Sequence, residues 1–193
     1  MQQQSCSSII NGWLTGAYHL PTVNCGARPV AAPIDLLVIH NISLPPGEFG
    51  TGKVQAFFTN CLDCSEHPYF AALADVQVSS HLLIERTGIV TQFVSFDDRA
   101  WHAGQSSFMG VDNCNDFSIG IELEGTDTLA YTAEQYQALV DVIRLLKLHY
   151  SGITSDRIVG HSDIAPGRKT DPGPAFEWVR LRAALSTTEG EQK

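Results

Sequence analysis

The sequence predicts an α/β or α+β fold with a mixed β-sheet. Runs of branched apolar residues, typical of strands, alternate along the chain with amphipathic patterns typical of helices. Two of these runs flank a short turn that contains glycine, as in a β-hairpin. The 193 residues include no internal repeat and no low-complexity linker, so we expect a single domain over residues 1–193.

The first predicted strand is Asp35–His40 (DLLVIH), a run rich in branched apolar side chains. Pro33 bounds it upstream, and the turn-prone segment Leu44–Gly47 bounds it downstream. His40 is therefore expected at the carboxyl end of this strand. A short helix is predicted next, over Gly52–Asn60.

A β-hairpin is predicted from Ser80–Glu85 (SHLLIE) and Ile89–Val94 (IVTQFV), because two β-rich runs flank a turn that contains Gly88. A loop over 95–115 comes next. Phe117–Leu123 (FSIGIEL) alternates between large apolar and small residues, which is typical of a strand with one face in the core. The second face stays small until it reaches Glu122.

An amphipathic helix is predicted over Tyr131–Tyr150, where apolar residues recur at helical spacing after the capping box formed by Thr132 and Gln135. We expect Gly152 to stop this helix. A short strand lies at 157–160 and ends at His161, and a last helix is expected to begin at Pro174.

The charge of the chain excludes some classes of partner. A formal net charge of −9 and the lack of a basic stripe argue against a nucleic-acid or anionic-membrane partner. The segment Met1–Cys6 has neither the basic start nor the apolar run of a secretory signal, and no later segment approaches the length of a membrane span. We therefore expect a cytoplasmic protein, and nothing in the sequence predicts an oligomer.

The cysteines fit the same compartment. There are five, an odd number without framework spacing, which is typical of free thiols under reducing conditions. Cys61-x-x-Cys64 has the spacing of half a zinc ribbon or of a redox pair. No second pair comes after it and no strand precedes it, so a functional role is the weaker interpretation.

Two histidines and one aspartate form a candidate metal site. His40 and His161 each terminate a predicted strand, and ligands in α/β folds gather at the carboxyl ends of strands. Asp171 lies in a loop rich in proline and glycine, which we expect to fold back near His161. Two imidazoles and one carboxylate leave a tetrahedral Zn²⁺ one open position for water, as in catalytic zinc sites. The pattern therefore predicts zinc binding.

Two further residues suit hydrolysis at such a site. Glu122, held on a strand behind small residues, is the expected general base for a zinc-activated water. Lys169 could offset negative charge that develops on a carbonyl oxygen. The alternative is plainer: His40 or His161 would be a packed, hydrogen-bonded side chain, and Glu122 with Lys169 an ordinary surface pair.

Four longer stretches carry a resemblance. They are residues 40–50 (HNISLPPGEFG), 99–104 (RAWHAG), 114–126 (CNDFSIGIELEGT) and 160–173 (GHSDIAPGRKTDPG). Together they resemble the AmpD family of N-acetylmuramoyl-L-alanine amidases, from about His40 to Gly173, whereas the segment before Pro33 matches only loosely. The resemblance implies a fold shared with peptidoglycan-recognition proteins, in which a mixed central β-sheet is flanked by helices.

The resemblance also implies roles for single residues. His40, His161 and Asp171 would bind zinc, Glu122 would accept a proton, and Lys169 would stabilise the transition state. The implied substrate is a small muropeptide, a 1,6-anhydro-N-acetylmuramoyl peptide, which would be cut between the lactyl group and L-alanine in peptidoglycan recycling.

Asn41 and Trp101 would face the substrate, because an indole face suits a sugar ring and an amide can bond its polar groups. Capping and core packing, respectively, are the alternatives for these two residues. Gln77 and Asn113 stand where some members of the family carry arginine, so the resemblance does not extend to contacts of those arginines with peptide carboxylates.

Two rival functions fit the same fold. A peptidoglycan-binding receptor with an inactive site would have lost a metal ligand, whereas the candidate ligands, base and lysine are all present here. A lytic amidase that acts on the intact wall would need export. His81 is interpreted as a structural residue or as a partner of the metal ligands, and His102 receives no role.

Overall fold

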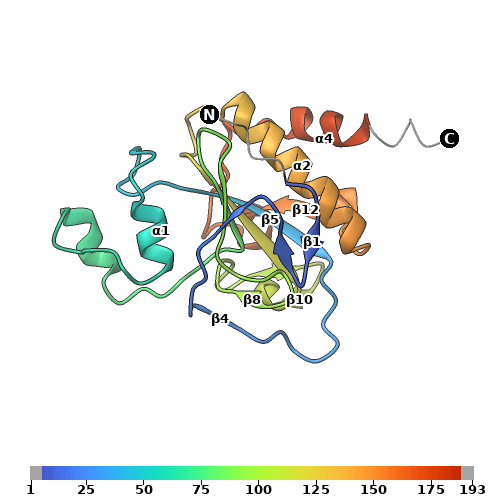
Figure 1. The fold of residues 1–193 in the computed structure, drawn as a ribbon, viewed down its shortest axis with the longest axis horizontal. Coiled ribbons are helices and arrows are strands. Elements are labelled where there is room, and N and C mark those ends of the chain that lie inside the picture. The colour runs from blue at the N-terminus through green and yellow to red at the C-terminus, as the bar shows by residue number, and fades with distance from the viewer. Residues whose placement is uncertain (1–5, 188–193) are drawn as a thin grey trace.

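The computed structural model describes residues 6–187 and confirms the predicted fold class. A mixed sheet of six strands, in the order β12-β5-β11-β6-β7-β3, forms the centre. Helices α2 and α4 cover one face, and the segment around β8 and β10 lies on the other (Figure 1). The strands are β1 (Ile9–Ile10), β2 (Trp13–Leu14), β3 (Tyr18–His19), β4 (Cys25–Gly26), β5 (Leu36–Ile42), β6 (Leu82–Ile84), β7 (Val90–Gln92), β8 (Arg99–Ala100), β9 (Ser107–Phe108), β10 (Val111–Asp112), β11 (Ser118–Glu124) and β12 (Ile158–Gly160). The helices are α1 (Lys53–Phe58), α2 (Ala133–His149), α3 (His161–Ile164) and α4 (Trp178–Ser186), with shorter 3-10 turns η1 (Pro68–Leu73), η2 (Cys114–Asp116) and η3 (Ser155–Arg157).

The centre of the sheet is parallel. β5 pairs with β12 on one side and with β11 on the other, and β11 pairs with β6, all in parallel. The prediction for β5 was short at its end, because the strand continues past His40 to Ile42. The parallel pairing with β11 extends that far and holds the two added residues in the sheet.

The predicted hairpin is present as β6 and β7, which pair antiparallel. Gly88 occupies its turn with a φ of 80°, a left-handed conformation that glycine adopts without steric cost. In contrast, the loop predicted over 95–115 contains short strands, because β9 and β10 pair with each other and β8 pairs with β4.

The two faces of β11 differ as the sequence predicted. Ile119, Ile121 and Leu123 pack in the main apolar cluster together with residues of α2. The opposite face carries Ser118 and Glu122, and all seven residues of the strand are buried. One side of β11 therefore builds the core, and the other side is available for polar chemistry.

Helix α2 begins as expected, because Thr132 is the N-cap and forms the capping box with Gln135. Two other predictions about helix ends were wrong. Gly152 does not stop α2 in a left-handed conformation; the helix ends at His149, and Gly152 lies in close contact with Asp35. Pro174 does not start the last helix, because residues 174–177 form turns and α4 begins at Trp178.

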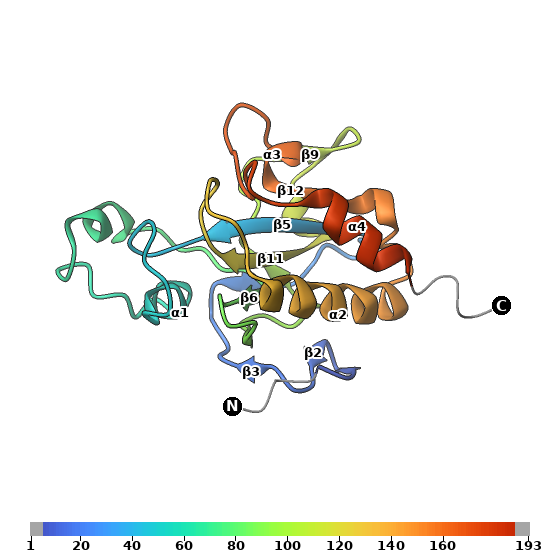
Figure 2. The same ribbon diagram turned by 90° about the horizontal axis from the view of Figure 1, so that it is seen from above.

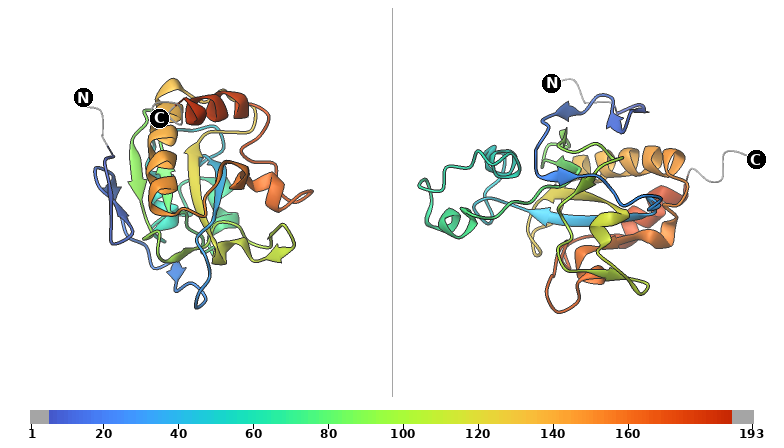
Figure 3. Two further views of the ribbon diagram at one scale, coloured as in Figure 1. Left: turned by 90° about the vertical axis from the view of Figure 1, so that its right-hand side faces the viewer. Right: turned by 90° about the horizontal axis from the view of Figure 1, so that it is seen from below.

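Helix α1 and the turn η1 form a lobe beyond the carboxyl end of β5 (Figure 2). Other directions of view show the same separation of this lobe from the sheet (Figure 3). An apolar cluster that includes Phe58, Phe70 and Phe93 joins the lobe to the hairpin side of the sheet. Within residues 6–187, no helix combines the length and the apolar character that a bilayer crossing requires.

Candidate functional site

The sheet brings the candidate residues to one place through its register. Glu122 of β11 is the direct partner of His40 in β5, so both side chains lie on the same face. On the other side of β5, Gly160 pairs with Ile39, and His161 comes after Gly160 as the first residue of α3. Three neighbouring strands therefore deliver two imidazoles and a carboxylate to adjacent positions.

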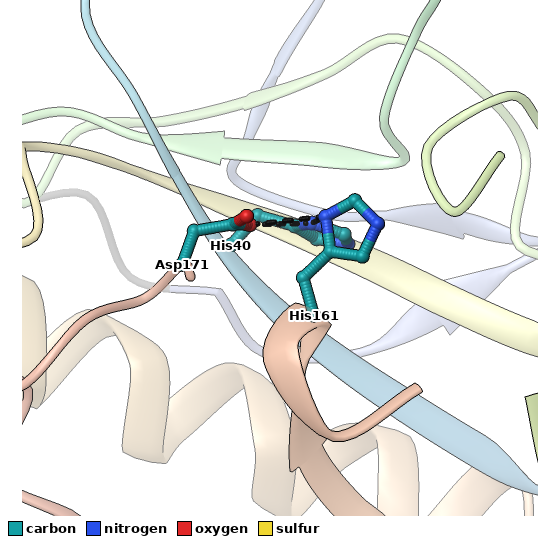
Figure 4. A group of neighbouring side chains, drawn as sticks. All are labelled: His40, His161 and Asp171. Atoms are coloured by element: carbon teal, nitrogen blue, oxygen red, sulfur yellow. Dashed lines mark hydrogen bonds and ion pairs between the residues drawn. The ribbon is translucent and has the colours of Figure 1, made fainter. Parts of the chain in front are cut away.

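The predicted metal ligands converge (Figure 4). His40 Nδ1 lies 2.9 Å from His161 Nδ1, and each of these nitrogens lies 3.1 Å from Asp171 Oδ2. Ligand atoms of a tetrahedral zinc ion, at bond lengths of about 2.0–2.1 Å, are separated by about 3.3 Å. The three atoms thus have nearly the spacing that such an ion requires.

The protonation of the two imidazoles also fits a metal. Burial lowers the pKa of His40 to about 4, so this ring is neutral near pH 7. His161 Nε2 lies 3.0 Å from the carbonyl oxygen of Ala103, which can only accept, and 3.4 Å from Arg168 Nη2, which can only donate. The shorter contact favours the neutral tautomer with the proton on Nε2 and a lone pair on Nδ1. Two imidazole nitrogens and a carboxylate oxygen this close together suit a cation between them, and these residues therefore fit a metal cofactor.

The loop that carries Asp171 is held from two sides. The backbone oxygen of Asp171 accepts from the N–H of Ser162 at 3.0 Å, and the hydroxyl of Tyr131 donates to the carbonyl of Pro172 at 2.8 Å. Gly173 lies so close to Asp127 that any side chain at position 173 would collide with the backbone there. These contacts fix the carboxylate opposite the two imidazoles.

Glu122 is buried, and its Oε2 has no hydrogen-bond partner among residues 6–187. Burial, followed by the negative charge of Asp171, raises the pKa of Glu122 well above its usual range. The positive charge of Lys169 acts in the opposite direction on that pKa. Lys169 itself is exposed, but its charge is near enough to influence both Glu122 and His40. A carboxyl with a raised pKa and a free oxygen suits proton transfer.

The two residues expected to face a substrate lie in different environments. Asn41, next to His40 on β5, donates an amide N–H to Asp127 at 2.8 Å. Trp101 is half-buried, and its backbone exchanges hydrogen bonds with Ser79. Part of the Asn41 amide is therefore already used within the protein.

Two other features of the sequence lie apart from this site. His81 bonds to Gly120, Asp98 and Arg28 rather than to the converging ligands, which is a structural role. Cys61 and Cys64 are free thiols in the α1–η1 lobe.

Sequence reasoning missed His102. Its Nδ1 lies 2.9 Å from His40 Nε2, and its ring is buried against β11. The one usable signal was the small face of β11, because Ser118 and Gly120 leave room for a ring beside His40.

Known proteins resemble this chain over most of its length. A family model described as N-acetylmuramoyl-L-alanine amidase matches residues 30–174. The 1,6-anhydro-N-acetylmuramyl-L-alanine amidase AmpD of Escherichia coli (strain K12) is 55% identical over 175 residues, which cover 91% of this chain and 95% of that protein. The crystal structure of a selenomethionine derivative of AmpD superposes with a TM-score of 0.90, at 53% identity, over 93% of this chain and 99% of the other.

A more distant structure contains a substrate. It is AmiD, an N-acetylmuramyl-L-alanine amidase from E. coli, in complex with anhydro-N-acetylmuramic acid-L-Ala-D-gamma-Glu-L-Lys. It is 32% identical, with a TM-score of 0.59, and the alignment covers 81% of this chain and 60% of that one.

Proposed function

Because this chain belongs to the N-acetylmuramoyl-L-alanine amidase family, we propose that it is a zinc-dependent hydrolase of 1,6-anhydro-N-acetylmuramoyl peptides. The bond cut is the amide between the lactyl group of the sugar and the L-alanine of the stem peptide. The observation that carries the proposal is the convergence of His40, His161 and Asp171 beside a buried Glu122. The names of the AmpD relatives and the ligand in the AmiD structure support the substrate.

His40, His161 and Asp171 would hold the metal. When bound, zinc would lower the pKa of a water molecule toward about 7 and would polarise the scissile carbonyl. Two imidazoles and a carboxylate are the usual donor set of catalytic zinc and leave a position open. Soft metals that prefer several thiolates are disfavoured, since no cysteine among residues 6–187 belongs to the group.

Glu122 moves the proton in this mechanism. Its free Oε2 takes a proton from the attacking water while the water oxygen bonds to the lactyl carbonyl carbon. The carbon–nitrogen bond then breaks as Glu122 passes that proton to the nitrogen of L-alanine. Burial keeps the carboxylate poorly solvated and therefore a stronger base than one in water.

Lys169 stabilises the oxyanion that forms at the lactyl carbonyl. Its exposed position at the rim leaves the ammonium free to approach a bound substrate. The loss of one donor to such an oxyanion typically costs about 3 kcal/mol in the barrier.

Asn41 and Trp101 are the proposed substrate contacts. The Asn41 amide donates to Asp127 and also hydrogen-bonds Tyr131, so its carbonyl oxygen is the group that would accept from polar groups of the substrate. The half-buried indole of Trp101, in the segment that also carries His102, would stack on the sugar ring.

The remaining parts of the proposal concern the whole protein. We treat residues 1–193 as one domain, since β3 pairs with β7 and Leu14 packs in the main apolar cluster. A location in the cytoplasm, with a role in peptidoglycan recycling, agrees with five free cysteines, the state that a reducing compartment maintains. A small muropeptide is the proposed partner, with no nucleic acid and no membrane.

The decisive assay is the release of stem peptide from an anhydro-muramoyl peptide, with and without a chelator, alongside intact murein sacculi. We expect release that the chelator abolishes and that added zinc restores, and we expect little release from sacculi. Glu122→Ala should abolish turnover while the zinc content stays at that of the unmodified protein. Full activity of Glu122→Ala, or of the chelated protein, would refute the mechanism.

A further inference from the structure

His102 lies between a proposed metal ligand and the central strand of the sheet. Its ring is buried, with Nδ1 facing His40 Nε2 at 2.9 Å and Nε2 facing Ser118 Oγ at 3.1 Å. His102 therefore connects Ser118 to His40 in a series of hydrogen-bonded polar groups.

The direction of the hydrogen bonds along this series is set at its far end. Ser118 Oγ lies 2.5 Å from the carbonyl oxygen of Cys114, which cannot donate, so the single hydroxyl proton of Ser118 points there. Ser118 Oγ must then accept from His102 Nε2–H.

The remaining protons are placed in the same way. A neutral His102 with its proton on Nε2 presents a lone pair at Nδ1, and that lone pair accepts from His40 Nε2–H. His40 is left with an unprotonated Nδ1, the nitrogen that faces His161 and Asp171.

We propose that His102 is a positioning residue that fixes His40 in the one tautomer able to bind metal through Nδ1. The proposal rests on the proposed zinc site. If these hydrogen bonds ran in the opposite direction, His40 Nδ1 would carry a proton and could not coordinate a metal. Partners of metal-bound imidazoles commonly act in this way.

The protein is shaped around His102. A Cβ atom at Gly120 would lie 2.5 Å from Cγ of the His102 ring, so the ring packs directly on the glycine of β11. Asn115 Oδ1 accepts from the backbone N–H groups of both His102 and Ala103, at 3.0 and 2.8 Å. Backbone and ring are thus both held in register with His40.

The same short segment serves the second imidazole. The carbonyl of Ala103, the next residue, lies 3.0 Å from His161 Nε2, closer than the 3.4 Å of Arg168 Nη2, and this shorter contact favours a proton on Nε2. One loop, anchored by Asn115 of η2, therefore sets the tautomers of both proposed histidine ligands. The adjacent Cys114 of η2 supplies the carbonyl oxygen that sets the direction of the hydrogen bonds from His40 through His102 to Ser118.

Two substitutions at position 102 separate this role from simple packing. His102→Leu fills similar space but cannot accept from His40, so zinc affinity should fall by about 10–100-fold. His102→Asn places a carbonyl oxygen about where Nδ1 lies and should restore most of that loss. The measurement is the zinc dissociation constant from chelator competition, on variants whose folding is checked by circular dichroism.

Substitutions of two buried serines provide a milder test and its control. Ser118→Ala removes the acceptor of His102 Nε2–H and should weaken zinc binding, by less than His102→Leu does. Ser80→Ala removes a buried hydroxyl that donates to the carbonyl of Gly120, without contact to either histidine. It should bind zinc as the unmodified protein does. Equal affinity for His102→Leu and the unmodified protein, or equal losses for His102→Leu and His102→Asn, would overturn the proposal.

A spectroscopic measurement needs no variant. In the metal-free unmodified protein, ¹⁵N shifts of the imidazoles report which nitrogen carries the proton. We expect His40 and His102 both protonated on Nε2, and a His40 protonated on Nδ1 would overturn the proposal. Failure of the unmodified protein to bind zinc would instead overturn the proposed function.

Discussion

At the scale of single residues, Glu122 shows how the fold changes the properties of a carboxyl group. A buried carboxyl without hydrogen bonds costs stability, and its Oε2 has no partner among the described residues. Burial raises its pKa, with the charge of Asp171 as a second cause. The sheet tolerates this cost because β11 pairs with β5 along its whole length and with β6 from Ile121 to Leu123.

Glu122→Gln should change how stability depends on pH in the metal-free protein. A carboxyl with a pKa raised by folding binds its proton more tightly in the folded state, so stability falls as pH rises from its ordinary pKa of 4.5 through the raised value. Glutamine does not titrate. The free energy of unfolding of the variant, relative to the unmodified protein, should therefore increase as the pH rises above 4.5. Parallel denaturation profiles across this range would contradict the raised pKa.

Lys169→Met tests charge at the rim of the site. The loss of an oxyanion partner should lower kcat by about 10²–10³-fold. Zinc affinity should stay near that of the unmodified protein, because Lys169 is not among the converging ligands. Steady-state kinetics and chelator competition measure the two quantities. An unchanged kcat would remove Lys169 from the mechanism.

At the scale of elements, the site depends on which strands are neighbours and on the residues directly after each strand. His40 lies on β5, Glu122 lies on β11, and His161 comes immediately after β12. Polar side chains at this end of the sheet are fixed to a rigid support, as a catalytic site requires. The apolar faces of the same strands pack under α2, so the stability of this helix supports the site from below.

Thr132→Ala tests that support. Thr132 Oγ1 accepts from the N–H of Gln135 at 3.0 Å and donates to the carbonyl of Arg86 at 2.8 Å. The loss of this N-cap should cost about 1 kcal/mol or more of unfolding free energy, with no change of the denaturant slope. Ser186→Ala, at the exposed end of α4, is the control and should change stability by less than about 0.5 kcal/mol. Equal effects of the two variants would contradict the role of the cap.

At the scale of the whole molecule, the site connects distant parts of the chain. His40 and Asp171 are 131 residues apart, and the contacts of Tyr131 and Ser162 close the loop that carries Asp171. A metal bound there would join the centre of the sheet to a loop near the carboxyl-terminal helix. Such a ligand binds only the folded chain and so stabilises it.

Zinc should therefore raise the melting temperature. Free zinc at about 100 times its dissociation constant contributes about 2.7 kcal/mol, which corresponds to roughly 5–10 °C for a chain of this size. Calorimetry with and without a chelator measures the shift. His161→Ala is the control and should show no shift. A zinc effect of the same size in that variant would locate the stabilising metal elsewhere.

The sequence by itself determined the elements whose pattern is local. The apolar run of β5, the alternation in β11 and the capping box of α2 depend on neighbouring residues alone, and all three were predicted. The ends of β5 and α4 were not, because pairing with β11 and turns at 174–177 decide them. Long motifs also indicated the convergence of His40, His161 and Asp171 before any distance was known.

Only the tertiary structure decided which way the hydrogen bonds run. The position of His102 depends on Gly120 of one strand, on Asn115 of a 3-10 turn and on His40 of another strand. No spacing along the sequence encodes these contacts. The position of each proton depends on the acceptor at the end of the hydrogen-bonded series, which only folding brings into place. Burial acts in the same way on Glu122, because the pKa of a carboxyl depends on neighbours that only folding assembles.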